Sequence, residues 1–390
     1  MTNVINFLYI KVKNYILIIG DRIKKRKRKK NKRIIIFNFT ILLLAVSFIL
    51  YKSTLNIDTH GYQKETYQVF KELNIVDKII DKDYSKTLEK IINTEYFDSK
   101  YIDEYININY KEEDNFIEQI YKLLNIGYKS NDINTIYNKL KTDNIELITS
   151  NNYMKDLTNM LNLTYFKNNN LERYIKYYLN NNYNYIDVIT YVNIGLDNDY
   201  YTNTKLVDNE NDITLLVNKY NYLNENYVPN DLTLINPKYT TRENKLRAQA
   251  ASSFEALAAD ALKDGIKIYA ASSYRSYSYQ KNLYNYYVSI DGIEEADTYS
   301  ARPGFSEHQT GLAVDIANIN KILIEENDKE FTWLKNNAHK YGFILRYQKS
   351  TEKITGYIYE PWHYRYVGTE LASYIYSNNI TYDEYIARNK

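Results

Sequence analysis

The sequence contains no cysteine among its 390 residues. This absence excludes disulfide bridges, thiolate zinc sites and cysteine nucleophiles. Histidine is also scarce, with only His60, His308, His339 and His363 in the chain. A metal site would therefore have to combine these few histidines with aspartate or glutamate.

Proline and glycine are rare too, with 4 and 11 residues, whereas hydrophobic residues make up 44% of the chain. This apolar content excludes an intrinsically disordered protein, and the length suffices for two domains. Tyrosine is unusually frequent, at 45 residues. Because this bias runs through the whole chain, tyrosine clusters alone say little about function.

The formal net charge is only +2, but its distribution is uneven. Residues 1–33 contain 12 of the 50 basic residues and one of the 48 acidic residues. The remaining chain therefore has 38 basic and 47 acidic residues, a net charge of −9. This acidic excess argues against a nucleic-acid partner for the protein as a whole.

An uncharged segment, residues 34–51, follows nine Lys or Arg residues at positions 24–33. Its 18 residues would extend about 27 Å as a helix, close to the thickness of a bilayer core. The basic residues predict a cytoplasmic N-terminus, a single transmembrane helix over 34–51 and an extracytoplasmic remainder. The alternatives are a buried core helix and a cleaved signal peptide, although no small-residue cleavage site follows Tyr51.

Residues 52–212 have the pattern of short helices separated by Asn- and Asp-rich turns. Apolar residues recur at spacings of three and four in 116–124, 133–140, 154–161 and 171–179. We expect an all-α spacer or array without a catalytic site. A binding role for a polymer or a protein partner is the alternative, and the sequence identifies no protein partner.

The composition changes at about residue 213, which we take as the start of a second domain over 213–390. In residues 311–317, Leu312, Val314 and Ile316 share one face of a predicted strand. Asp315 projects from the other face among glycine and alanine, and His308 lies seven residues upstream. The small neighbours leave room for a bulky group to approach the Asp315 carboxylate.

Residues 356–368 add Glu360 and His363, three positions apart. These positions would face opposite sides of a straight strand, but Pro361 permits a bend that brings them together. Two histidines and one aspartate with an open position are typical of catalytic zinc. An additional glutamate is what a metal-activated water needs as its general base.

Together these motifs resemble the VanY-type zinc D-alanyl-D-alanine carboxypeptidases over about residues 213–385. The resemblance rests on Ser306-x-His308 with Asp315, on Glu360-x-x-His363, and on the upstream run from Ser273 to Gln280. It implies an α+β domain in which a small antiparallel sheet carries the metal ligands and helices flank it.

The resemblance also implies a role for each matching residue. The substrate would be the stem peptide of peptidoglycan, from which the terminal D-Ala is removed. The implied zinc (Zn2+) ligands are His308, Asp315 and His363; the implied catalytic residues are Glu360, as general base and then acid, and Arg275, which stabilises the oxyanion; the implied substrate-binding residues are Gln280, Ser306 and Tyr347.

Two alternatives remain open at this point. The same residues could serve an L,D-carboxypeptidase or an endopeptidase acting on peptidoglycan stems, because pocket shape determines which bond is cleaved. The protein could instead be a non-catalytic cell-wall-binding or scaffold protein whose helical array is the working part.

Overall fold

The structure is a computed structural model that describes residues 13–14, 40–47 and 59–390. All of the predicted basic segment 1–33 except residues 13–14, and much of the predicted span 34–51, lie outside the described residues. Residues 40–47 are helical. None of the helices in the described ranges has both the length and the apolar character needed to cross a membrane. By internal contacts the chain divides into two compact units, 1–117 and 118–390.

The first unit contains short helices around a small apolar core. Phe70, Ile79, Leu88 and Ile91 are buried in it. Ser85 is the N-cap of one helix, and its side chain accepts a hydrogen bond from the Leu88 backbone N–H at 3.2 Å. The elements of this unit are α3 (Lys64–Glu72), α4 (Val76–Ile79), α5 (Lys86–Ile91), η1 (Ser99–Tyr101) and α6 (Ile102–Asn107).

Further short helices follow where the apolar spacing predicted them. Asn184 caps the last of these helices by accepting from the Asp187 backbone N–H at 3.0 Å. That helix ends at Gly195, whose φ of 110° favours glycine. The elements of this stretch are α7 (Phe116–Ile126), α8 (Ser130–Lys139), α9 (Thr142–Thr149), α10 (Leu157–Asn162), η2 (Asn168–Asn170), α11 (Leu171–Asn180) and α12 (Tyr185–Ile194).

The expected antiparallel sheet is confirmed in the C-terminal part of the second unit. It has four strands in the order β5-β6-β8-β7. The alternation predicted for residues 311–317 is confirmed, because Leu312, Val314 and Ile316 pack in the main core with Phe254 of α13. The bounds are β5 (Tyr269–Ser272), β6 (Ala313–Ala317), β7 (Phe343–Leu345), β8 (His363–Tyr366) and α13 (Ala248–Lys263).

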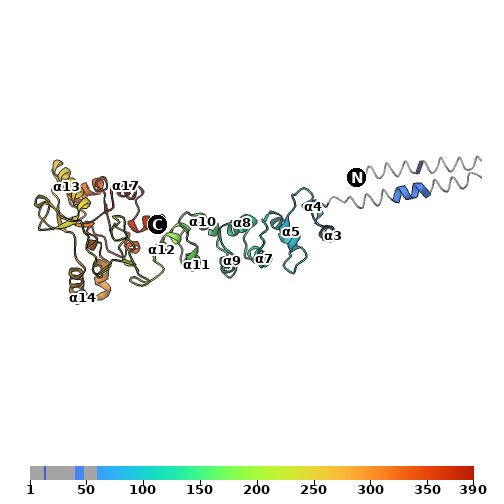
Figure 1. The fold of residues 1–390 in the computed structure, drawn as a ribbon, viewed down its shortest axis with the longest axis horizontal. Coiled ribbons are helices and arrows are strands. Elements are labelled where there is room, and N and C mark those ends of the chain that lie inside the picture. The colour runs from blue at the N-terminus through green and yellow to red at the C-terminus, as the bar shows by residue number, and fades with distance from the viewer. Residues whose placement is uncertain (1–12, 15–39, 48–58) are drawn as a thin grey trace, which may run out of the picture. The chain divides into compact units, whose positions relative to one another are not determined.

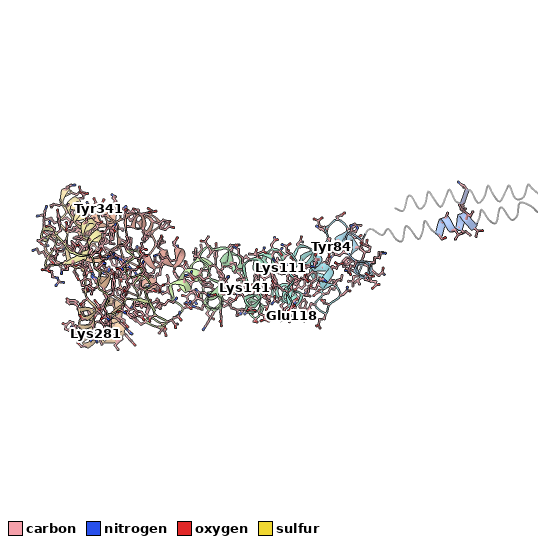
Figure 2. All side chains as sticks on the ribbon, in the orientation of Figure 1. Tyr84, Lys111, Glu118, Lys141, Lys281 and Tyr341 are labelled. Carbon is pink, nitrogen blue, oxygen red and sulfur yellow. The ribbon has the colours of Figure 1, made fainter. Side chains whose placement is uncertain are left out.

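Helix α14 (Tyr277–Tyr299) lies on the opposite side of this C-terminal part from α13 (Figure 1). In Figure 2 Lys281 of α14 and Tyr341 lie on these opposite sides. Gly292, with φ 80° and ψ 170°, interrupts the helical backbone of α14. The remaining elements are β1 (Lys205–Leu206), β2 (Asn221–Tyr222), β3 (Leu232–Leu234), η3 (Pro237–Tyr239), β4 (Lys245–Arg247), η4 (Glu307–Thr310), α15 (Lys329–Asn337), η5 (Ala338–Tyr341), α16 (Glu352–Thr355), α17 (Thr369–Asn378) and α18 (Tyr382–Asn389).

The last helix of the array packs against the C-terminal helix of the chain. The Asn193 side chain of α12 donates to the carbonyl of Ala387 at 3.1 Å. Arg388 of α18 donates from Nε to the Thr190 hydroxyl at 3.2 Å. The C-terminus accordingly lies beside α12 in Figure 1. Residues 118–212 and the sheet domain therefore belong to one compact unit.

Candidate active site

Three of the predicted site residues meet on one face of the sheet. Asp315 of β6 and His363 of β8 are direct partners in the antiparallel register. Residues opposite each other in such a pair project to the same face. His308 comes from η4, just before β6. Ligand atoms of the three residues all lie within 4.8 Å of one another.

The two imidazoles turn specific nitrogens toward the Asp315 carboxylate. Asp315 Oδ1 lies 3.4 Å from His308 Nε2 and 3.3 Å from His363 Nδ1. His308 Nδ1 is 2.7 Å from the carbonyl oxygen of Ser273, to which it donates. This hydrogen bond fixes the tautomer that leaves the Nε2 lone pair facing the site.

This donor set fits a zinc ion. The buried Asp315 Oδ1 has no hydrogen-bond partner among the described residues. Burial and the charge of Arg275 lower the pKa of His308, which favours the neutral imidazole that ligation requires. Burial would also lower the pKa of His363, but Asp315 and Glu307 raise it to about 9, so a metal ion would displace a proton from this ring. Burial alone would raise the pKa of Asp315, but His308 and His363 hold it well below its usual value. Two nitrogens and one carboxylate oxygen match a catalytic zinc site with an open position.

Glu360 lies in a turn immediately before β8, at the place where the sequence predicted a bend because of Pro361. The His363 backbone N–H donates to the Glu360 carbonyl at 3.2 Å across this turn. Glu360 Oε2 then lies 3.5 Å from His363 Nδ1. Burial is the main reason that the pKa of Glu360 rises, to about 7. A carboxylate of this pKa can both accept and release a proton near neutral pH.

Arg275 approaches the same point from the end of β5. Its Nη1 lies 3.9 Å from Asp315 Oδ2, and its backbone N–H donates to the His308 carbonyl at 3.2 Å. A fixed guanidinium in this position can stabilise negative charge that develops next to the metal ligands.

A cavity of about 410 Å³ contains the ligands, Glu360 and Arg275. Ser306 and Tyr347 line it, as predicted. Gln280 is buried and is not among the lining residues; its Nε2 donates to the carbonyl of Ala301, which is one of them. Direct contact between Gln280 and substrate stays a prediction. The sequence did not indicate the apolar and aromatic part of the wall, which consists of Leu283, Tyr287, Tyr299, Leu323, Tyr357, Ile358 and Trp362.

Glu307 is a further buried residue of the site that the sequence did not reveal. Its Oε2 lies 3.4 Å from His363 Nε2, the ring nitrogen that faces away from Asp315. Its Oε1 accepts from Arg346 Nε at 2.8 Å and from Arg365 Nη1 at 3.0 Å. Burial would raise the pKa of Glu307, but these two arginines hold it below its usual value. Glu307 therefore remains a carboxylate beside His363 Nε2, a position from which we expect it to orient the His363 ring.

We expect Glu307→Gln to weaken zinc binding about 10–100-fold, the usual effect of removing an outer partner of a ligating histidine. Asp383→Asn is the matched control, because Asp383 pairs with Arg346 at 2.6 Å, whereas the acids that pair with His363 in the described structure are Glu307, Asp315 and Glu360. Both substitutions neutralise a buried acid, and melting curves would report the loss of stability. Competition with a chelator should show weaker zinc binding in Glu307→Gln only. Equal zinc affinity in the two variants would contradict the orienting role.

Tyrosines at the end of the helical array surround Lys219, which lies against Tyr357 in the wall of the catalytic cavity. Lys219 Nζ lies 4.4 Å from the ring centre of Tyr357, 4.8 Å from that of Tyr200 and 5.1 Å from that of Tyr201. The Tyr201 and Tyr357 hydroxyls are 3.3 Å apart. Tyr357 in turn packs against Tyr347. Residues that precede the predicted domain boundary at 213 therefore contribute to the surroundings of the site.

Comparison with known proteins agrees with this geometry. The family model of the VanY D-alanyl-D-alanine carboxypeptidases matches residues 243–369. YodJ of Bacillus subtilis (strain 168), whose name assigns it provisionally to the carboxypeptidases, is 39% identical over 210 residues. That match covers 50% of this chain and 77% of YodJ.

Two solved structures are also similar to this chain. The LD-carboxypeptidase LdcB is 39% identical, with a TM-score of 0.46, and the match covers 50% of this chain and 95% of LdcB. A variant of the D,D-pentapeptidase VanY from the VanB-type resistance cassette, in complex with Zn(II), is 34% identical, with a TM-score of 0.39. That match covers 44% of this chain and 98% of the VanY chain. By its family match and its identity with YodJ, the chain belongs to the VanY family of D-alanyl-D-alanine carboxypeptidases.

Proposed function

We propose that this protein is a membrane-anchored zinc enzyme that removes the terminal D-Ala from peptidoglycan stem peptides. The observation that carries the proposal is the convergence of five side chains in one cavity. His308, Asp315 and His363 offer ligand atoms within 4.8 Å of one another, and Glu360 and Arg275 lie beside them.

In this proposal His308 Nε2, Asp315 Oδ1 and His363 Nδ1 hold the zinc ion. Zinc, when bound, polarises the scissile carbonyl and lowers the pKa of water at the site. Glu360 accepts the proton of the attacking water. Its burial favours the protonated carboxyl, so that it can then pass this proton to the leaving amine of D-Ala.

Arg275 stabilises the negative charge that develops on the carbonyl oxygen during attack. Its guanidinium is held at the edge of the ligand cluster, so it needs little reorganisation when the charge forms. The lining residues Ser306 and Tyr347 would bind the end of the peptide. Tyr347 also packs against the His363 ring, with ring centres 4.9 Å apart, so it can position both substrate and ligand.

The proposed anchor rests on the sequence. The uncharged residues 34–51 follow nine basic residues, which favour a cytoplasmic N-terminus and an extracytoplasmic enzyme. Residues 52–212 would act as a helical spacer between the membrane and the catalytic domain, where stem peptides are accessible. Release of the full-length chain from membranes by alkaline carbonate would contradict this anchor.

The choice of bond can be tested with two synthetic stems. The full-length chain, in detergent and with zinc, would be incubated separately with a pentapeptide ending in D-Ala-D-Ala and with the tetrapeptide. The proposal predicts that only the pentapeptide loses one D-Ala, as read by mass. Cleavage of the tetrapeptide alone would identify an L,D-carboxypeptidase. No cleavage of either peptide by zinc-loaded protein would favour an endopeptidase or a non-catalytic wall-binding protein.

A further inference from the structure

A second cavity, of about 750 Å³, lies apart from the catalytic pocket. Its walls come from η2, α11, α12 and the short strand β1, all before residue 213, and from the short strand β2 of the next domain. All these elements belong to the compact unit 118–390. The catalytic mechanism uses none of the residues that line this cavity.

The cavity has a strong bias toward positive charge. Lys167, Arg173 and Lys205 line it, and no aspartate or glutamate is among its lining residues in the part of the chain that the structure describes. This is unexpected, because acidic residues outnumber basic residues by 47 to 38 after residue 33. The cavity therefore concentrates cations in an acidic part of the protein, as a site for an anion would.

Two of these cations are exposed and lack an ion-pair partner within the described ranges. Arg173 is paired with Asp197, with Nε 2.7 Å from Oδ2. Lys167 and Lys205 form no ion pair with any residue in the described ranges. Partial desolvation and, to a lesser degree, repulsion from the charge of Lys205 lower the pKa of Lys167. A bound anion would relieve this repulsion.

The rest of the lining is rich in amides. Seven asparagines contribute to it, including Asn168 and Asn169, whose exposed side chains form no hydrogen bond with the described part of the chain. An amide side chain can both donate and accept, which suits hydroxyl and acetamido groups. Tyr220 adds an aromatic surface, and its hydroxyl donates to the Asn198 carbonyl at 3.0 Å.

We propose that this cavity binds an acidic carbohydrate polymer, a chain of sugar or polyol units that carries carboxylate or phosphate groups. Lys167 and Lys205 would bind the acidic group, and the asparagines would bind the hydroxyls. Tyr220 follows Lys219, which packs against Tyr357 of the catalytic pocket, so a polymer bound here would lie in the same compact unit as the site of peptide cleavage. This binding role goes beyond the proposed hydrolysis and does not depend on it.

The test compares two double variants of the full-length chain. Lys167→Gln with Lys205→Gln removes the unpaired cations. Lys141→Gln with Lys155→Gln removes the same charge from exposed positions of the array that do not line the cavity; Figure 2 labels Lys141. Calorimetric titrations would use a glycerol-phosphate oligomer, a carboxylated muramyl oligosaccharide and neutral chitotetraose as probes.

We expect the unmodified chain and the control to bind an acidic probe, and the Lys167/Lys205 variant to lose about tenfold or more in affinity, the scale of one lost charge-assisted hydrogen bond. Binding of only the phosphate probe or only the carboxylate probe would identify the acidic group.

The Lys167/Lys205 variant should keep its melting temperature and its activity on a free pentapeptide. Equal affinity in both double variants, no binding of either acidic probe, or equally tight binding of chitotetraose would overturn the proposal.

Discussion

Replacing Glu360 with glutamine should leave zinc bound but lower the turnover of a pentapeptide stem at least about 100-fold, the usual scale for removal of a general base. Glutamine has nearly the same shape and can occupy the same buried turn before β8. It cannot accept the proton of the attacking water. The three ligand atoms come from other residues, so the metal content of the protein should not change.

Turnover by mass-detected D-Ala release, together with zinc content by elemental analysis, would check this expectation. Glu370→Gln is the matched control, because it makes the same chemical change at an exposed position in the first turn of α17. The control should retain full activity. A Glu360→Gln protein that is loaded with zinc and turns over substrate at the normal rate would exclude Glu360 as the base.

Replacing His308 with alanine should abolish stoichiometric zinc binding and, with it, activity. His308 supplies one of the three ligand atoms, and a hydrogen bond to the Ser273 carbonyl holds its ring in place. Loss of an outer partner alone costs about 10–100-fold in metal affinity, so loss of a ligand should exceed about 100-fold. Zinc content after dialysis against a weak chelator measures the effect.

His339→Ala is the control for this substitution. His339 lies in η5 and stacks on Tyr376 with ring centres 3.8 Å apart, outside the catalytic cavity. Both variants remove one imidazole, and melting curves would show whether each remains folded. We expect the His339 variant to keep one zinc per chain. Retention of one zinc per chain by folded His308→Ala would mean that the ligand set is different.

The cluster of His308, Asp315 and His363 could be predicted from the sequence for two physical reasons, and the resemblance to the VanY family implied that these residues are the zinc ligands. With no cysteine and only four histidines, few combinations of residues could form a catalytic zinc site. The strict alternation around Asp315 also predicted that Asp315 lies on the strand face away from the core. Side chains on a strand alternate between its two faces, and the apolar face must pack against the core. Glu360 was predictable through the bend that Pro361 allows before β8 and through the Glu360-x-x-His363 motif that resembles the VanY family.

Glu307 shows what the sequence could not reveal. It stands next to His308, but its partners Arg346 and Arg365 are 39 and 58 positions away. No periodicity links these positions, and only the folded sheet brings them together around His363. An acid adjacent to a histidine ligand was the one available signal, and it is weak without the arginines.

The helical array was predictable locally but not in its packing. Apolar spacing located the short helices, because each must bury one face. The contacts that join α12 to α18 include both an apolar cluster, with Ile194 and Ala387, and hydrogen bonds, and they link residues more than 190 positions apart, such as Asn193 with Ala387. The cavity between the array and the next domain could not be predicted either. Tyr and Asn occur throughout the chain, so the Tyr and Asn residues that line the cavity did not distinguish it.

Anomalous diffraction at the zinc edge, from crystals of the zinc-loaded protein, tests the central claim most directly. We predict one strong peak per chain, within about 2.0–2.2 Å of His308 Nε2, Asp315 Oδ1 and His363 Nδ1, with Glu360 unligated beside it. A main peak elsewhere in the molecule, or one in which Glu360 replaces Asp315 as a ligand, would contradict the proposed metal site and the role of Glu360 as the base.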